Sequence, residues 1–185
     1  MPILGIIASS ISGNLVTNSY ESIATVSGDG SSTSIAFNSI SGTYKHLQIR
    51  YIGRFASGGG TTSTTANLRF NSDSGSNYAN HYLRGTGSAA DAGAATSSAQ
   101  NFALIAQSGA PSNVFTAGII DLLDYQNSNK YKTVRAIYGY EDNSSGELQF
   151  RSGLWMNTAA ITSITISSTN PFATNSKFAL YGIRG

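Results

Sequence analysis

Cysteine is absent from the 185-residue chain, which excludes disulfide bonds, thiolate nucleophiles and cysteine-ligated zinc. Charged residues are also scarce, at 11% of the sequence against an average of about 25%. The net charge is only +2 and no run of lysine or arginine occurs, whereas nucleic-acid-binding domains carry basic patches. We therefore expect no nucleic-acid partner, and we expect packing or oligomerisation to supply the stability.

A hydrophobic run long enough to cross a membrane is missing as well. The N-terminal sequence MPILGIIASSISGNL begins apolar, but it lacks a basic region and is too short to span a bilayer. We expect residues 1–19 to form an arm or a first strand, and we expect no membrane partner. The arm would anchor the protein to a partner chain through four apolar residues: Ile3, Leu4, Ile6 and Ile7.

Alternation of apolar and polar residues is the dominant pattern in what the sequence does contain. It is clearest in KHLQIRYIGRF (45–55), where a period of two predicts a half-buried antiparallel strand. One face would carry Leu47, Ile49, Tyr51, Gly53 and Phe55, and the other His46, Gln48, Arg50 and Arg54. Similar runs are YESIATVS, TSIAFN, ANLRF, NFALIA, VFTAGIIDLL, YKTVRAIYGYE, ELQFRSGLWM, ITSITISS and KFALYGIRG. Together they predict about ten strands.

Turn-forming segments rich in glycine, serine and asparagine separate these runs, as in SGDGSS, DSGSN and EDNSSGE. No stretch has sustained helical spacing, and the alanine-rich segment 85–100 (GTGSAADAGAATSSAQ) is expected to be a surface loop because glycine and serine interrupt it. Many short strands without helices predict an all-β fold, either a β-sandwich or a barrel, and about ten strands fit an antiparallel β-sandwich of the jelly-roll type. We expect one such domain over residues 20–185, preceded by the arm.

The segment RFNSDSGSNYANHYLRG (69–85) combines serine, aspartate and one of only two histidines. It lacks the G-x-S-x-G elbow of a serine nucleophile, and a single carboxylate is a poor cage for calcium. We therefore predict a turn between two strands, although an ion in residues 71–77 remains an open alternative. Its polar and aromatic side chains are predicted to contact a partner subunit or a sugar: Asp73, Asn77, Tyr78 and His81.

Other groups of residues that could bind a metal or phosphate, or catalyse a reaction, give only weak sequence signals. Two histidines, His46 and His81, cannot supply a three-histidine zinc site. No glycine-rich segment completes a phosphate-binding motif. Glycoside hydrolysis needs a carboxylate pair at a set separation, which sequence cannot establish for the five candidates Asp121, Asp124, Glu141, Asp142 and Glu147. We expect no catalytic residues, no metal and no cofactor.

Three stretches carry a resemblance: MPILGIIASSISG, YESIATVSGDGSSTSIAFNSISGTYKHLQIRYIGR and LWMNTAAITSITISSTNPFATNSKFALYGIRG. They resemble small β-rich virion structural proteins of tailed bacteriophages. The resemblance covers both ends and much of the chain, and its motifs are strand and turn patterns. It implies a non-enzymatic jelly-roll component displayed in many copies on the particle surface, and it brings no catalytic motif.

Two functions follow from this resemblance as expectations. The first is a capsid decoration or cement protein, whose arm holds neighbouring subunits of the major capsid protein and whose body forms a symmetric homotrimer. The second is a tail-fibre or receptor-binding module that contacts host surface glycans through aromatic and asparagine-rich loops. The sequence does not decide between the head and the tail of a particle.

Overall fold

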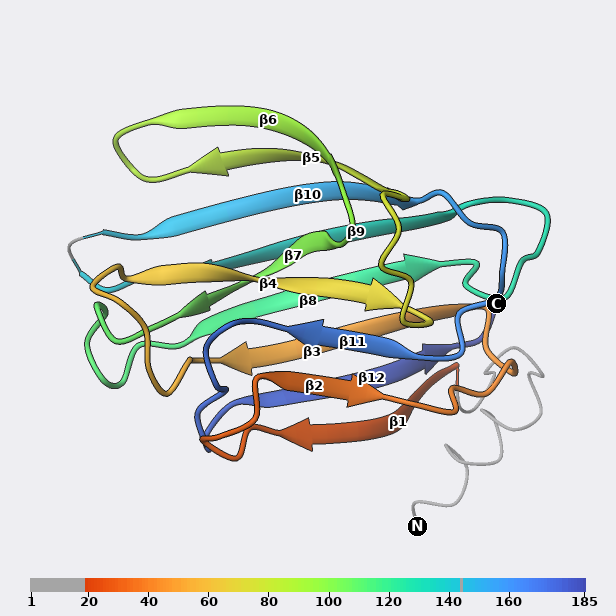
Figure 1. Ribbon diagram of the computed structural model, residues 1–185, viewed down its shortest axis with the longest axis horizontal. Coiled ribbons are helices and arrows are strands. Elements are labelled where there is room, and N and C mark those ends of the chain that lie inside the picture. Colours follow the sequence, from red (N-terminus) through yellow and green to blue (C-terminus); the bar gives the residue numbers. More distant parts are fainter. Residues whose placement is uncertain (1–18, 144) are drawn as a thin grey trace, which may run out of the picture.

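The computed structural model describes residues 19–143 and 145–185, which form twelve antiparallel strands (Figure 1). No helix able to span a membrane occurs in this part of the chain. The strands are β1 (Tyr20–Ser27), β2 (Ser34–Phe37), β3 (His46–Gly53), β4 (Ser63–Phe70), β5 (Tyr78–Gly85), β6 (Ala90–Ser97), β7 (Gln100–Ala106), β8 (Thr116–Leu123), β9 (Lys132–Tyr140), β10 (Glu147–Trp155), β11 (Ile164–Ser167) and β12 (Lys177–Ile183).

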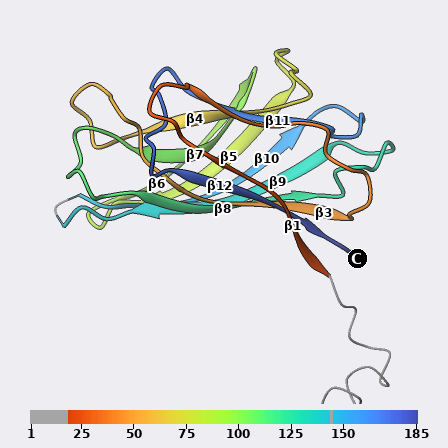
Figure 2. The same ribbon diagram turned by 90° about the horizontal axis from the view of Figure 1, so that it is seen from below.

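Two antiparallel sheets pack face to face (Figure 2), so the predicted all-β sandwich is confirmed. The larger sheet has the order β1-β12-β3-β8-β9-β10-β5-β6, and the smaller has the order β2-β11-β4-β7. The quartet β1-β12-β3-β8 together with the smaller sheet gives the strand order of a jelly roll. The hairpins β5–β6 and β9–β10 are inserted into that order and extend the larger sheet beyond β8.

One hydrophobic core lies between the sheets, because the inward side chains of both sheets are apolar over most of their length. In β3 the predicted alternation is confirmed: Leu47 and Ile49 are fully buried and Tyr51 is 5% exposed, while the intervening residues face outward. Aromatic rings add directional packing, with Phe178 stacked on Tyr51 and edge-on to Phe172. The core therefore joins the two sheets of the described chain into one packed body.

All ten predicted runs are strands, with ends that differ by a few residues. The prediction of a surface loop over residues 85–100 was wrong, because the centre of this segment forms β6, the edge strand of the larger sheet. β6 pairs with β5 along its whole length, with Leu83 opposite Ala92. The small side chains of this segment have weak propensities of their own, and the backbone ladder to β5 decides its conformation.

The predicted anchoring residues Ile3, Leu4, Ile6 and Ile7 lie outside the described residues. The described chain starts at Ser19, immediately before the edge strand β1. β1 pairs with β12 from Tyr20 opposite Ile183 onwards, so both ends of the described chain lie at the same edge of the larger sheet (Figure 1).

Candidate interaction surface

The loop between β4 and β5 closes around the carboxylate of Asp73. Trp155 Nε1 donates a hydrogen bond to Asp73 Oδ2 at 2.8 Å, and Asn77 Nδ2 donates to the same oxygen at 3.0 Å. The backbone N–H of Gly75 donates to Oδ1 at 2.9 Å. These donors, first among them Asn77 and then Trp155, lower the pKa of Asp73, because each favours the charged form. Asp73 therefore ties the loop to the end of β10.

Tyr78 lies in the core and not at the surface, which corrects its predicted role as a surface contact. Its side chain has 0% exposure and stacks on Trp155 with ring centroids 6.4 Å apart. Its hydroxyl donates to the carbonyl of Asp73 and accepts from the backbone N–H of Phe70, both at 3.1 Å. The reason is that Tyr78 is the first inward position of β5.

His81 is exposed on the outer face of the larger sheet, between Ser152 of β10 and Ala94 of β6. Asp73 and Asn77 instead lie in the loop before β5, where their polar atoms bind each other. His81 is also separated from His46 by four strand spacings, or about 19 Å. The two histidines accordingly do not form a joint site.

Metal binding has no support from the geometry of residues 71–77. Asn71 Oδ1, one of the predicted oxygen ligands, accepts hydrogen bonds from the backbone N–H groups of Thr162 and Ser163 at 2.8 and 3.1 Å. Both oxygens of Asp73 accept donors of the loop itself or of Trp155. Nowhere in residues 19–143 or 145–185 do three or more histidine, aspartate or glutamate side chains gather as metal ligands would.

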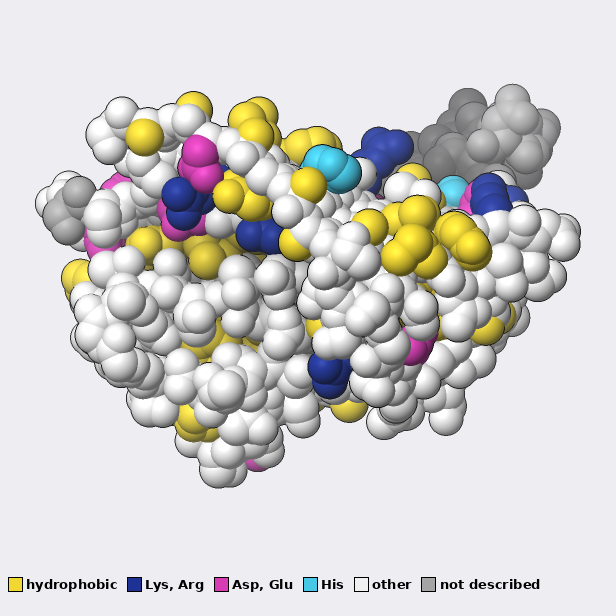
Figure 3. Space-filling model, turned by 45° about the horizontal axis from the view of Figure 1, so that its top comes forward, with side chains coloured by type: hydrophobic (Ala, Val, Ile, Leu, Met, Phe, Trp, Pro, Cys, Tyr) yellow, Lys and Arg dark blue, Asp and Glu magenta, His cyan; other side chains and the backbone are white. Residues whose placement is uncertain are grey.

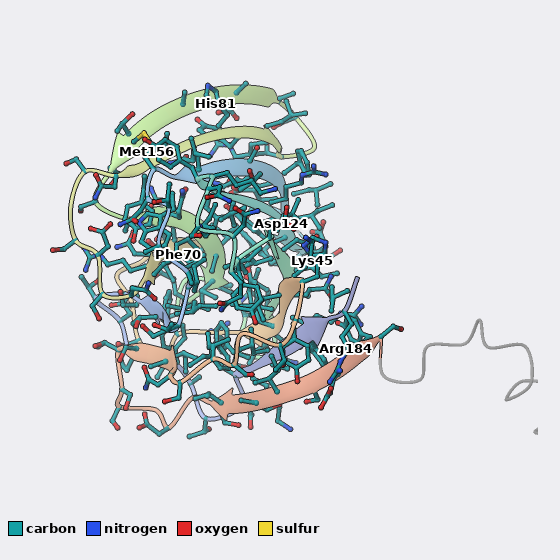
Figure 4. All side chains as sticks on the ribbon, turned by 90° about the vertical axis from the view of Figure 1, so that its right-hand side faces the viewer. Lys45, Phe70, His81, Asp124, Met156 and Arg184 are labelled. Atoms are coloured by element: carbon teal, nitrogen blue, oxygen red, sulfur yellow. The ribbon has the colours of Figure 1, made fainter. Side chains whose placement is uncertain are left out.

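Asp124, at the turn after β8, is held by cations and not by a second carboxylate. Its carboxylate binds Lys130 and lies 3.3 Å from Lys45 Nζ, and its backbone N–H donates to His46 Nδ1 at 2.9 Å. The hydrogen bond from Lys130, and to a lesser degree that from Lys45, lowers the pKa of Asp124. Figure 4 shows Asp124 beside Lys45, with His81 far away toward the β5–β6 edge. This cluster fixes a turn.

The other candidate carboxylates are dispersed, apart from one pair. Asp121 lies on β8 and accepts a hydrogen bond from Gln48 Nε2 at 2.7 Å. The β9–β10 hairpin brings Glu141 and Glu147 to one hollow of about 710 Å³. Glu141 accepts the backbone N–H of Asn143 at 3.0 Å, and Glu147 accepts from a neighbouring glutamine. Both carboxylates thus serve contacts within their own hairpin.

An apolar area on the outer face of the larger sheet is the feature that sequence reasoning missed. Cross-strand pairing places Leu83, Phe150, Ile137 and Ile119 in one row across β5, β10, β9 and β8. Leu148 and Ile52 flank this row. Exposure reaches 59% for Leu83, 58% for Leu148 and 51% for Phe150. We call this area the outer patch: Ile52, Leu83, Ile119, Ile137, Leu148 and Phe150.

Polar side chains occupy the inner face behind part of the outer patch. Arg151 of β10 is only 7% exposed, donates through Nε to Gln149 Oε1 at 2.9 Å, and lies 4.9 Å over the ring of Tyr82. Tyr138 donates to the same glutamine oxygen at 2.9 Å, and burial raises the pKa of its hydroxyl strongly. β10 therefore points polar groups inward and apolar groups outward.

The apolar and polar positions of β10 alternate visibly in ELQFRSGLWM, but alternation does not say which face is covered. The outer patch could have been found only by combining that alternation with the pairing of β10 to β5 and β9.

No protein-family model, no curated protein and no solved structure matches this chain.

Proposed function

We propose that this protein is a non-enzymatic structural component of a bacteriophage virion, a capsid decoration or cement protein that forms symmetric oligomers on the particle surface. The observation that carries the proposal is the jelly-roll order of β1-β12-β3-β8 over β2-β11-β4-β7, an architecture that recurs in viral capsid domains. Fold alone does not fix function, so the proposal also rests on the surface chemistry and on the N-terminal segment.

The surface suits a protein that packs in many copies. Charged side chains are sparse on the side of the molecule in Figure 3, and most of what is exposed there is uncharged. Weak long-range repulsion between neighbours follows from so few charges. In this proposal the body forms a trimer, and its partners are further copies of itself and the major capsid protein.

The N-terminal segment is the proposed anchor. It precedes β1, at the edge of the larger sheet, and it contains Ile3, Leu4, Ile6 and Ile7. Apolar side chains buried against a capsid subunit would each contribute about 1.5–3 kcal/mol of transfer free energy. The segment would thus hold the body to the particle while the sheets project outward.

Particles of the virus that encodes this chain provide the test. Particles assembled with protein that lacks residues 2–12 should retain little of it, as measured by quantitative mass spectrometry of purified particles. A matched control replaces Ser9 and Ser10 with alanine and should keep full occupancy. Full occupancy after the deletion contradicts the anchor, and a copy number of only a few per particle contradicts the cement role.

A tail-fibre or receptor-binding module that contacts host glycans is the second candidate. One observation favours it: Tyr20 and Tyr181 stack with centroids 4.8 Å apart on the outer face, and Arg50 lies 5.3 Å from the Tyr20 ring. Exposed aromatic faces are suited to sugars, and jelly rolls also occur in lectins. A glycan array with the purified protein tests it, with Tyr20→Ala as the variant that should lose any specific signal.

A further inference from the structure

We infer that the outer patch is the surface through which copies of this chain bind one another. The inference deepens the proposed function, which rests on symmetric oligomers, by naming their contact. It starts from the continuity of the patch: Leu83 pairs with Phe150, Phe150 with Ile137, and Ile137 with Ile119. Single exposed apolar residues are common on monomers, whereas contiguous apolar areas mark contact sites.

The polarity of β10 gives a second reason. Its inward side chains Gln149 and Arg151 are 4% and 7% exposed, while its outward side chains Leu148 and Phe150 are 58% and 51% exposed. A strand with one face in water normally turns its polar side outward. The reverse arrangement in β10 is the one expected of a strand whose outer face is covered.

The shape of the outer face fits an apolar partner with side chains like its own. A hollow of about 480 Å³ is lined by Ile119, Ile137 and Leu148, and small residues, Ala117 and Gly139, form part of its lining. The same two residues also line the hollow of about 710 Å³ beside it. Raised leucine, isoleucine and phenylalanine side chains thus lie next to depressions, so a ridge on one copy can enter a hollow on another.

Acidic side chains lie at one end of this row of hollows and basic side chains at the other. Glu141 and Glu147 line the hollow at the β9–β10 hairpin, whereas Arg50 and Lys177 line a third hollow beside Ile52. The six residues of the outer patch are uncharged, and Arg50 borders them directly, because it also lines the middle hollow and lies opposite Ile119. About a twofold axis, or around a threefold ring, the acidic end of one copy meets the basic end of the next, and the residues nearest the axis meet their own equivalents without repulsion.

The area is also sufficient. Eight strands of mostly eight residues, at about 4.8 Å between strands and about 3.3 Å per residue, give an outer face of roughly 1,000 Å². Stable protein–protein contacts bury about 800 Å² per partner. A second copy that covers most of this face would therefore form an interface of ordinary size.

The mass of the purified full-length protein in solution tests the inference. We expect two or three copies at about 10 µM by analytical ultracentrifugation. The double substitution Leu148→Asp and Phe150→Asp should raise the dissociation constant at least 100-fold and give monomers. A matched control, Ser34→Asp and Ala36→Asp, adds two carboxylates to exposed positions of β2, which lies in the smaller sheet and away from the patch, and should keep the oligomer.

Circular dichroism and thermal unfolding must show that the double variant is folded; if it is not, Leu148→Ser with Ile137→Thr replaces it. Wild-type protein that remains monomeric at 100 µM overturns the inference, and so does a folded double variant that keeps its mass. Loss of the oligomer on deletion of residues 2–18, but not on substitution of the patch, assigns the contact to the N-terminal segment and also overturns it. Because these masses are measured without particles, an oligomer that fails to bind particles refutes the proposed function alone.

Discussion

One strand from each half of the larger sheet shows opposite polarity, although both belong to one continuous ladder of hydrogen bonds: β3 from the jelly-roll half (β1, β12, β3 and β8) and β10 from the added half (β9, β10, β5 and β6). In the jelly-roll half, β3 buries Leu47 and Ile49 and exposes Arg50. In the added half, β10 buries Gln149 and Arg151 and exposes Phe150. Both strands alternate with a period of two, so the difference shows that what covers a face, and not the strand itself, decides which set of side chains is apolar.

The change of polarity follows the edge of the smaller sheet. Its four strands complete the jelly roll with β1, β12, β3 and β8, whereas β9, β10, β5 and β6 extend beyond that set. One end of β10 still reaches the shared core, because Trp155 packs on Phe70 and Tyr78. A Cβ on Gly153 would lie 2.5 Å from the ring of Phe102, which shows how closely β7 approaches at that end. Farther along β10 the inner face becomes polar.

The largest expected effect is the difference in unfolding free energy between two leucine-to-alanine substitutions, one in each half of the larger sheet. Leu180→Ala removes a fully buried side chain of the jelly-roll half and should lower the free energy of unfolding by about 2–5 kcal/mol at any protein concentration. Leu148→Ala removes a 58% exposed side chain, which should cost less than about 0.5 kcal/mol in the monomer. Urea unfolding at 1 and 100 µM measures both effects.

If copies pack on the outer patch, the cost of Leu148→Ala should grow with protein concentration, because binding of native copies stabilises them. The loss of unfolding free energy caused by Leu180→Ala should be the same at every protein concentration. Equal losses for both leucines at 1 µM would contradict the polarity difference between the halves.

The polar inner face of the added half gives the next largest effect. Arg151→Ala removes the donor to the buried Asn80 Oδ1 and one of the two donors to Gln149 Oε1, the other being Tyr138. The acceptor left unsatisfied at Asn80 should lower the free energy of unfolding by about 1–3 kcal/mol. The control Arg135→Ala, at an exposed outward position of β9, should change it by less than about 0.5 kcal/mol. Chemical denaturation of both variants decides the point, and a larger loss for Arg135→Ala would reverse the assignment of inner and outer faces.

Local patterns made most strands predictable but not their neighbours. The alternation in β3 and the turn residues around it are local signals, and both the strand and its buried face were predicted correctly. The β6 segment has no such signal, because its alanines and serines suit a loop as well as a strand. Its pairing with β5 is a tertiary effect that residue propensities do not contain.

The same limit applies to the site residues. Tyr78 follows a run of serine, glycine and asparagine that suggests exposure, yet it starts the inward face of β5. Trp155, which binds Asp73, lies 82 positions away in the sequence. A contact over that separation depends on the strand order of the whole sheet, and the alternation of either segment carries no information about it.

The Asp73 loop, where the added half joins the core, should show the smallest effect and a dependence on pH. Hydrogen bonds from Asn77 and Trp155 lower the pKa of Asp73 in the folded protein, so its ionised form stabilises the fold above the unfolded pKa of about 3.9, and this contribution disappears as the pH falls through the folded pKa. Asp73→Asn cannot ionise and should cost about 1 kcal/mol at pH 7. Urea unfolding at pH 7, 5 and 3 should show the gap between wild type and variant narrowing only below pH 4, whereas Ser74→Ala, at an exposed neighbour, should track the wild type throughout. A gap that stays constant down to pH 3 would mean that the carboxylate charge does not hold β10 to this loop.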